Sequence, residues 1–428
     1  MHDTIFALSS GAPPAAIAVV RISGPRAGEV LAALAGRLPK SRRATAVTLS
    51  DPADGAPLDR ALALWLPGPA TATGEDVAEL HLHGGRAVVA AIEAALARFP
   101  GLRRAEAGEF TRRAFANGRI DLAEAEGLAD LLAAETELQR RSAMAMASGA
   151  LSRMVEGWRE RMLGLGAAVE AVLDFADEDD VAHLPESFAH NCGELADELG
   201  EWLERPRAEP LREGFRVVLA GPPNAGKSSL FNALTDSEAA ITSAIPGTTR
   251  DVITRTVAIE GVPLQFVDTA GLREEGADAV ERIGIDRALG AARDADLLLW
   301  LGPEGEGPKE VRVWEIAPQC DRADHPHKAN ARHSISAHRG DGLAVLRADI
   351  VATARTALPK PGDVALGERQ QRLLGECRDA VTCAAERDDP LLIAESLRLA
   401  RVALDRLVGR AGTEDMLDAL FGRFCIGK

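Results

Sequence analysis

With 428 residues the chain is too long for one hydrophobic core, and ordinary domain sizes predict roughly two to four domains. A hydrophobic share of 46% and a charged share of 27% are typical of folded globular proteins, which excludes a fibrous or disordered chain. The formal net charge of −16 opposes long-range attraction to nucleic acid, although a local basic patch can still bind phosphates.

The start of the chain and its cysteines indicate a cytoplasmic protein. Met1-His2-Asp3-Thr4 places an acid where a secretory signal carries basic residues. No apolar run approaches the ~20 residues that a membrane span needs. Five cysteines, widely spread and without a CxxC pair, favour reduced thiols over a disulfide framework or a zinc site. We therefore expect a cytoplasmic location and no membrane partner.

The N-terminal part of the chain mixes short apolar runs with Gly and Pro turns. Strands are predicted at Ile17–Ile22, Leu62–Leu66 and Glu79–Leu82, and a helix at Ala87–Phe99. This mixture predicts an α+β domain. The dipeptide Arg112-Arg113 is one of several Arg pairs, most of which we expect on solvated faces of helices and loops.

A helical pattern follows the turn at Asn117-Gly118. Apolar residues then fall three and four apart to about Leu203, where Pro206 and Pro210 end the pattern, and helical periodicity returns from Glu368 to Phe424. Alternating βα units lie between these helical parts. We therefore predict a multidomain chain, in which an α/β P-loop domain is inserted into an all-α helical domain whose two halves pair with each other. The expected bounds are 1–117 for the α+β domain, 118–210 and 359–428 for the helical domain, and 211–358 for the insertion.

The inserted domain opens with a phosphate-binding motif. The buried-strand pattern Phe215–Ala220 precedes Gly221-Pro-Pro-Asn-Ala-Gly-Lys-Ser228, which has the spacing GxxxxGK[ST] between a strand and a helix. In such a loop, backbone N–H groups surround the β-phosphate, Lys227 neutralises the β and γ oxygens, and the Ser228 hydroxyl ligates Mg²⁺. The other expected nucleotide-binding residues of this loop are Asn224, Ala225, Gly226 and Ser229.

Two further phosphate elements follow in the order that a nucleotide switch requires. The predicted strand Leu264–Asp268 ends in Asp268-Thr269-Ala270-Gly271, where Asp268 holds Mg²⁺ through water and the Gly271 N–H senses the γ-phosphate. Between the two lies Gly247-Thr248-Thr249-Arg250-Asp251, in which a Thr hydroxyl completes the Mg²⁺ shell only while a γ-phosphate is present. The three elements predict a nucleotide triphosphatase that acts as a switch.

The element that reads the base departs from the usual Asn-Lys-x-Asp. The strand Val311–Ile316 leads into Pro318-Gln319-Cys320-Asp321, which keeps only the Asp that accepts guanine N1–H and N2–H. After the strand Ala331–Ile335, Ser336-Ala337 stands where a backbone N–H would bind guanine O6. The surviving acceptor favours guanine over adenine. Without the Asn and Lys, we expect the loop to lose its link to the phosphate loop and to bind all guanine nucleotides more weakly.

The chain carries further motifs besides its phosphate loop: Val20-Arg21-Ile22-Ser23-Gly24-Pro25, Thr73-Gly74-Glu75-Asp76 through His83-Gly84-Gly85, Gly108-Glu109-Phe110-Thr111 through Asp121-Leu122-Ala123-Glu124-Ala125-Glu126, Gly247 to Asp251, and Cys425-Ile426-Gly427-Lys428. With these motifs the chain resembles one family, the tRNA modification GTPases of the MnmE, or TrmE, type, over essentially its whole length. The resemblance implies a homodimer held by N-terminal domains that bind 5-formyltetrahydrofolate or a related one-carbon tetrahydrofolate. It also implies an FAD-dependent partner protein, with which the complex uses GTP to modify carbon 5 of the wobble uridine of certain tRNAs.

The resemblance assigns roles to residues at both sites. The folate residues would be Arg21, Glu79, Arg119 and Lys428, where Arg119 stands in a position that often holds Lys in the family. The aromatic residue usual before Thr73 is Ala72 here, so no stacking contact is expected from it.

A monovalent cation, K⁺, neutralises charge in the GTP site of the family. The matching K⁺ ligands would be Asn224, Ser243, Ile245 and Thr248, while Thr249 would ligate Mg²⁺. Glu281 matches the acid that orients the attacking water, although the stretch between Gly271 and Glu281 is one residue longer than the family pattern.

Three side chains keep two interpretations open. His81 and His83 fall on one side of a predicted strand and suit either a metal site or hydrogen-bonded core positions. Cys425 is either a small buried hydrophobe beside Phe424 or, as the terminal motif implies, a catalytic participant in the modification.

Three functions remain in competition. The leading one is a GTPase whose cycle drives a folate-dependent tRNA modification. The second is a ribosome-assembly-type switch that binds RNA without modifying it, which usually requires a basic module that this acidic chain lacks. The third, a folate-binding scaffold with a degenerate GTPase, is raised by the altered base-reading loop.

Overall fold

The computed structural model describes residues 3–174, 183–236, 253–268, 294–309, 311–322, 328–411, 414–422 and 424–428. The chain divides into two compact units: Met1–Ala129 with Leu404–Lys428, and Asp130–Ala403. The boundaries fall inside helices α4, Leu122–Ala133, and α13, Pro390–Leu407. Among the described residues, no helix combines the length and the apolar character that a membrane span requires.

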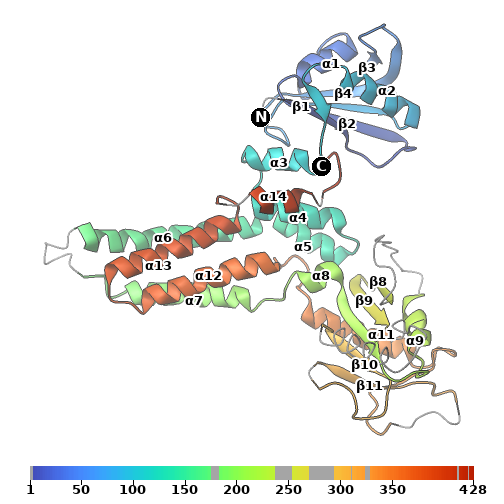
Figure 1. The fold of residues 1–428 in the computed structure, drawn as a ribbon, viewed down its shortest axis with the longest axis vertical. Coiled ribbons are helices and arrows are strands. Elements are labelled where there is room, and N and C mark those ends of the chain that lie inside the picture. The colour runs from blue at the N-terminus through green and yellow to red at the C-terminus, as the bar shows by residue number, and fades with distance from the viewer. Residues whose placement is uncertain are drawn as a thin grey trace, which may run out of the picture. The chain divides into compact units, whose positions relative to one another are not determined.

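A six-stranded sheet forms the centre of the first unit, with the strand order β3-β4-β5-β2-β1-β6. Neighbouring strands are antiparallel except for β1 and β6, which pair in parallel. Figure 1 shows helices α1, Ala27–Ala35, and α2, Arg86–Ala97, beside this sheet. The strands are β1 Thr4–Leu8, β2 Ile17–Ser23, β3 Thr45–Ser50, β4 Pro57–Leu66, β5 Val77–His83 and β6 Leu102–Arg104.

The alternation of side chains along β2 and β5 separates the two faces of this sheet. Val20 and Ile22 on β2 and Leu80 on β5 lie in one buried cluster with the apolar residues of α1 and α2, so both helices cover the same face. Arg21 and Glu79 occupy the alternate positions and therefore point to the opposite face. The predicted α+β architecture is confirmed.

Short helices and the C-terminal segment complete the first unit. They are α3, Glu109–Ala116, the start of α4, and α14, Glu414–Phe421. The rings of Phe115 and Phe421 have centroids 6.1 Å apart, and those of Phe421 and Phe424 are 6.2 Å apart. These aromatic contacts join α3 to the C-terminal segment of the chain.

Antiparallel helices from both sides of the insertion form the helical part of the second unit (Figure 1). Helix α12, Glu368–Ala385, packs along α7, Phe188–Leu203, although 164 residues lie between the end of α7 and the start of α12. The indole rings of Trp158 and Trp202 meet edge to face with centroids 5.6 Å apart. The expectation that segments before and after the insertion pair with each other is confirmed. Helices α5 Glu137–Ala147, α6 Ala150–Asp174 and most of α13 also belong to this part.

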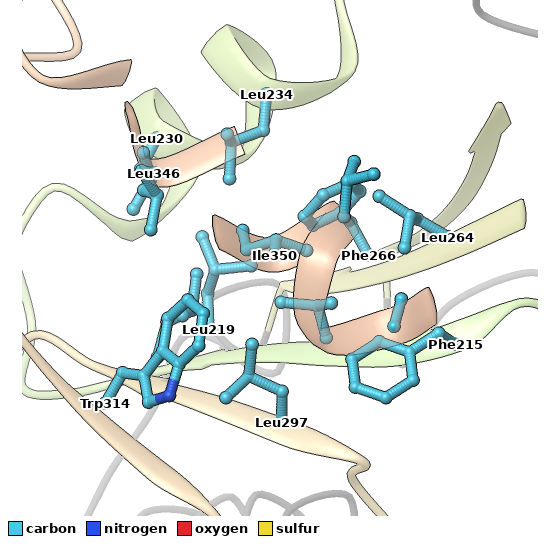
Figure 2. Close-up of a cluster of buried hydrophobic side chains, with 14 of the residues drawn as sticks. Phe215, Leu219, Leu230, Leu234, Leu264, Phe266, Leu297, Trp314, Leu346 and Ile350 are labelled. Atoms are coloured by element: carbon cyan, nitrogen blue, oxygen red, sulfur yellow. The ribbon is translucent and has the colours of Figure 1, made fainter. Parts of the chain in front are cut away.

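A second six-stranded sheet forms the inserted α/β part, with the strand order β12-β11-β10-β7-β9-β8. Its neighbours are parallel except for the edge pair β8 and β9. Figure 2 shows the core, where apolar side chains from the strands meet those of α9 and α11. The elements are α8 Glu209–Glu213, β7 Phe215–Ala220, α9 Lys227–Thr235, β8 Ile253–Ile259, β9 Val262–Asp268, β10 Leu297–Trp300, β11 Val313–Ala317, β12 His333–Ser334 and α11 Leu343–Ala357.

This strand order places the expected nucleotide residues along one edge of the sheet. The chain leaves β7 toward β9 and β8 and later returns to β10 on the other side of β7. In open parallel sheets ligands bind outside the carboxyl ends of the strands at such a reversal. The loop after β7 begins at Gly221, directly at this position. The P-loop fold class predicted from the sequence is confirmed.

Candidate functional site

The loop between β7 and α9 has the backbone that a phosphate cradle needs. Gly221 has φ 149° and Gly226 has φ 88°, both in the region that favours glycine. A Cβ on Gly221 would lie 2.9 Å from the backbone nitrogen of Gly302, so this position also tolerates no side chain. No side chain caps the start of α9, and its positive dipole end faces the loop. These features suit a bound anion.

Lys227 holds its ammonium group inside this loop. Its side chain is buried, and Nζ donates hydrogen bonds to the carbonyl oxygens of Gly221 and Pro222, each at 2.8 Å. Ser228 and Ser229 lie exposed on the first turn of α9, whereas Ala225 packs partly buried against the core of the α/β part. The ammonium group is therefore held inside the loop by two of the loop's own carbonyl oxygens.

Three further expected residues lie at the carboxyl ends of neighbouring strands. Asp268 ends β9, is 1% exposed, and pairs in register beside Leu219 of β7. Asp321 follows β11, and Ser336 follows β12. Because these strands are parallel, their carboxyl ends share the edge at which the phosphate loop lies. The structure thus brings the phosphate residues and the base residues of the second unit to one edge.

Asp321 and Ser336 meet directly. A hydrogen bond from the Ser336 side chain holds the pKa of Asp321 below its usual value, so the carboxylate stays an acceptor. Ser336 is fully buried, and its Oγ accepts a hydrogen bond from the Arg339 N–H at 3.1 Å. Ala337 lies beside it and is partly buried. A hydrogen bond therefore connects the two loops that hold the expected base-reading residues.

The expected loss of the link between the base loop and the phosphate loop is wrong. Nε2 of Gln319 donates a hydrogen bond to the backbone carbonyl oxygen of Asn224 at 3.4 Å. The sequence showed only that Asn and Lys were missing, because a Gln in the Lys position carries no signal of which backbone group it meets. Gln319 is a residue that sequence reasoning missed.

Several expected site residues lie outside the described residues. They are Ser243, Ile245, Thr248 and Thr249 of the first switch segment, and Thr269, Ala270, Gly271 and Glu281 of the second.

The first unit contains the residues that the resemblance assigns to folate. Arg21 and Glu79 face each other across β2 and β5, and the guanidinium donates to Glu79 Oε1 at 2.9 Å. The guanidinium also lies 5.8 Å from the ring centroid of Phe110. His81 Nε2 is 3.4 Å from Glu79 Oε2. A cation, a carboxylate and an aromatic ring thus share the sheet face opposite α1 and α2.

Three motifs that are far apart in the sequence converge beside this face on Glu75. Its carboxylate accepts a hydrogen bond from Ser23 Oγ at 2.8 Å and from Arg113 Nη1 at 3.1 Å. Ser23 Oγ also lies 2.7 Å from Thr73 Oγ1. Arg113 is 2% exposed, so the expectation of solvated faces, which holds for most of the Arg pairs, does not hold for this residue. The pairings join residues up to 52 positions apart, so no local pattern predicts them.

Arg113 also bonds to Asp3 and Glu109. Its Nη2 donates to Asp3 Oδ1 at 2.9 Å and to Glu109 Oε1 at 3.0 Å. Arg103 adds hydrogen bonds to the same two carboxylates at 2.6 and 2.5 Å. Burial acts to raise the pKa of Glu109, but the hydrogen bonds from Arg103, the Glu106 N–H and Arg113 outweigh it and lower that pKa. We call these five residues the Arg113 network: Asp3, Glu75, Arg103, Glu109 and Arg113.

Arg119 lies against the same loop as Glu75. A Cβ on Gly74 would lie 3.2 Å from Cγ of Arg119 and 2.8 Å from Cβ of Asn117. Nδ2 of Asn117 donates to the carbonyl oxygen of Thr73 at 2.7 Å. The side chain of Arg119 is exposed, and Gly74 leaves room for its stem.

The C-terminal segment lies against the sheet of the first unit. Ile426 forms an antiparallel bridge with Ala107, and Gly427 approaches β1 so closely that a Cβ there would lie 2.2 Å from the carbonyl oxygen of Leu8. Lys428 follows and is partly exposed. Cys425 is exposed, so its interpretation as a buried hydrophobe is wrong, while Phe424 is buried.

Neither His81 nor His83 gains a metal ligand set. His83 Nδ1 lies 2.7 Å from Asp59 Oδ1, and His81 contacts Glu79. Within the described part of the chain, no group of three or more His, Cys, Asp or Glu side chains is placed to hold a metal ion.

Comparisons with known proteins match nearly the whole chain. A family model described as GTP-binding protein TrmE N-terminus matches residues 4–119, and one described as MnmE helical domain matches residues 122–425. A protein of Novosphingobium aromaticivorans named tRNA modification GTPase MnmE is 65% identical, with both chains covered fully. Proteins of the same name from Erythrobacter litoralis and Zymomonas mobilis are 62% and 49% identical over 100% and 99% of this chain and all of theirs.

Proposed function

Since this chain belongs to the MnmE family of tRNA modification GTPases, we propose that its GTP cycle drives modification of carbon 5 of the wobble uridine in certain tRNAs. The one-carbon unit would come from 5-formyltetrahydrofolate or a related tetrahydrofolate. A flavin-dependent partner protein would act with a homodimer of this chain. We place the reaction in the cytoplasm, where the tRNA substrate is found.

The observation that carries the GTP part of the proposal is the convergence of the phosphate loop, Asp268, Asp321 and Ser336 at one sheet edge. The buried Lys227 ammonium would neutralise the β- and γ-phosphates, which strengthens the contact because water is excluded there. Asp321 would accept hydrogen bonds from guanine, and the Ala337 N–H would bind its O6.

The acidic and hydroxyl groups at this edge fit Mg²⁺, a hard cation that prefers oxygen ligands. Ser228 and Thr249 would ligate it directly, with Asp268 acting through water. Asn224 would bind K⁺ together with Ser243, Ile245 and Thr248. The two cations would supply positive charge for phosphoryl transfer, and Glu281 would orient the attacking water.

The folate part of the proposal is supported by complementary chemistry on the sheet face opposite α1 and α2. A tetrahydrofolate has N–H donors on its pterin ring and carboxylates on its glutamate tail, so it requires both an acceptor and cations. Glu79 supplies the acceptor, and Arg21, Arg119 and Lys428 supply the cations. The exposed thiol of Cys425, near Lys428 in the chain, would be available to the modification reaction.

The proposal assigns residues 1–117 to folate binding and dimerisation, 118–210 and 359–428 to the helical domain, and 211–358 to the GTPase domain. The order β7–α9, β9, β11, β12 supports the last of these ranges, because the phosphate loop, Asp268, Asp321 and Ser336 each lie at or after the end of one of these strands.

One experiment separates this proposal from its competitors. The purified chain is mixed with the flavin-dependent partner, unmodified tRNA, the one-carbon folate and GTP, in K⁺ or in Na⁺ buffer. Wobble nucleosides are measured by mass spectrometry and phosphate release in parallel. The proposal predicts faster hydrolysis in K⁺ and a C5-modified uridine that requires both GTP and folate. Hydrolysis with no modified uridine would favour the RNA-binding switch instead.

A further inference from the structure

One side chain joins the base-reading loop to the phosphate loop. Gln319 lies in the position of the missing Lys, and its Nε2 donates to the carbonyl oxygen of Asn224 at 3.4 Å. A Cβ placed on Gly226 would lie 3.5 Å from this Nε2 and 3.9 Å from Cγ of Gln319. The Gln319 side chain therefore lies over the phosphate loop between Asn224 and Gly226.

Arg322 specifies the orientation of the Gln319 amide. Its Nη1 donates to Gln319 Oε1 at 3.4 Å, and its backbone N–H donates to the Gln319 carbonyl oxygen at 3.0 Å. A reversed amide would place its oxygen against the Asn224 carbonyl and its NH₂ group against the guanidinium. Because both contacts would then be repulsive, the two partners allow a single orientation.

The backbone at both ends of the bond has an uncommon conformation. Asn224 has φ 62° and Gln319 has φ 56°. In the described part of the chain only four non-glycine residues have positive φ, and this hydrogen bond joins two of them. Such conformations are unfavourable for residues with a Cβ and persist where the surrounding structure holds them. Both loops are thus held in one particular arrangement at their point of contact.

We infer that Gln319 is a positioning residue for the guanine nucleotide, which ties the base-reading loop to the phosphate loop in place of the missing Asn and Lys. The inference rests on the GTP binding described above. Loops that are already in place need no ordering when the nucleotide binds, so the bound state is more stable. Loss of the bond should therefore make nucleotide release faster. Base choice would remain with Asp321 and the Ala337 N–H, and a separate hydrogen bond joins Asp321 to the neighbouring Ser336.

The bond also links the base loop to the proposed K⁺ site. It holds the backbone of Asn224, whose side chain is the proposed cation ligand. Freeing that backbone would let the amide oxygen move away from the cation, so more K⁺ would be needed for hydrolysis. A second readout therefore accompanies nucleotide release.

The test measures release of a fluorescent GDP analogue by stopped flow from the full-length protein. Gln319→Ala removes the bond, and release should accelerate by about threefold to tenfold, as expected for one neutral hydrogen bond. Gln319→Met keeps an unbranched stem without the amide, so it should release as fast as the Ala variant. Gln319→Lys restores a donor of similar reach and should return release toward the wild-type rate.

Two controls accompany this series. Gln265→Ala removes another amide-to-carbonyl hydrogen bond of the same domain, from Nε2 to Glu213 at 3.5 Å, and should leave release unchanged. The preference for GTP over ATP should be the same in every Gln319 variant, while the K⁺ concentration for half-maximal hydrolysis should rise in the Ala and Met variants alone.

Unchanged release from both the Ala and the Met variant would overturn the inference, as would fast release from the Lys variant. If the Ala variant does not fold, the Met and Lys variants decide between the two outcomes. A wild-type chain that binds no guanine nucleotide would contradict the GTPase function itself, which is a different result.

Discussion

Nη1 of Arg113 lies 3.1 Å from Oε2 of Glu75, and this ion pair between a buried and a partly buried side chain joins helix α3 to the loop that follows β4. Both residues come from motifs that carry the family resemblance. The Glu75 carboxylate also accepts a hydrogen bond from Ser23 of a third motif. These contacts explain why the three motifs occur together, because each supplies a partner for the same carboxylate.

Loss of the Arg113 guanidinium should destabilise the first unit. Arg113→Ala would leave the carboxylates of Glu75, Glu109 and Asp3 with less compensating charge, and breaking such a buried pair costs roughly 3–5 kcal/mol. Hydrogen exchange of peptides from residues 3–119 should show this loss of protection. Arg104→Ala, which removes the surface pair with Glu93 at 2.8 Å, is the control and should have little effect. Equal protection in wild type and Arg113→Ala would contradict the role of the network.

The same network predicts acid sensitivity. The pKa values of Asp3 and Glu109 are lowered, because hydrogen bonds to Arg side chains outweigh the opposing effect of burial. Carboxylates with lowered folded-state pKa values stabilise the fold above their unfolded pKa, and this stabilisation is lost as the pH falls through the folded pKa. Protection of residues 3–119 should therefore fall steeply below about pH 4. Glu109→Gln should have lower protection at neutral pH and a flatter pH profile.

Lys227 should be required for nucleotide binding. Lys227→Ala removes a charge-assisted contact of ~1.5–3 kcal/mol, so affinity for GTP should fall at least about tenfold. Isothermal titration measures the change. Lys309→Ala removes an exposed cation from the same domain and should bind normally. Unchanged affinity in Lys227→Ala would rule out the phosphate-loop assignment.

Glu281 should act in hydrolysis and not in binding. If it orients water, Glu281→Ala should keep its GTP affinity while turnover falls by about 10²-fold or more. Phosphate release under single-turnover conditions measures the chemical step directly. Normal turnover would move the role to another acid, with Glu274 and Glu275 as the next candidates.

Asp321 should decide the base. Asp321→Asn replaces an acceptor with a donor, so preference should shift from GTP toward xanthosine triphosphate, with a loss of ~1.5–3 kcal/mol for GTP. Competition binding with the two nucleotides measures the shift. A variant that still prefers GTP would place the base reader elsewhere in residues 320–338.

The expected effect of the altered loop on affinity now depends on Gln319. The sequence predicted weaker binding of guanine nucleotides because both Asn and Lys are absent. With the bond from Gln319 to Asn224 in place, part of the preorganisation is retained. Weaker binding of guanine nucleotides stays a prediction for this chain, and the Gln319→Ala variant should bind them more weakly still.

The C-terminal segment should be needed for folate binding. Deleting Gly427-Lys428 removes the proposed terminal cation, and Gly427→Ala should have nearly the same effect, because its Cβ would collide with the carbonyl oxygen of Leu8. Calorimetry with 5-formyltetrahydrofolate compares both with wild type. Gly375→Ala, which places its methyl group in open space on α12, is the control. Wild-type affinity in the deletion variant would exclude Lys428 as a ligand.

The sequence by itself determined the elements whose signals are local. The strand Phe215–Ala220 was predicted at its observed bounds, because a buried parallel strand is a continuous apolar run and the glycines after it mark the loop. The insertion of the α/β part was also predictable, because Pro206 and Pro210 end the first helical pattern and helical periodicity returns only from Glu368. These are features of consecutive residues, and spacing alone records them.

Only the tertiary structure decided which distant residues meet. That Gln319 bonds to Asn224, that Arg113 is buried against Glu75, and that Gly427 lies against Leu8 all depend on how strands and loops pack. A long polar side chain has the same local pattern whether it lies in solvent or reaches a carbonyl or carboxylate of another segment. Its partner is fixed by the geometry of the sheet edge or face on which it lies, because burial is favourable only where a complementary group is within hydrogen-bonding distance.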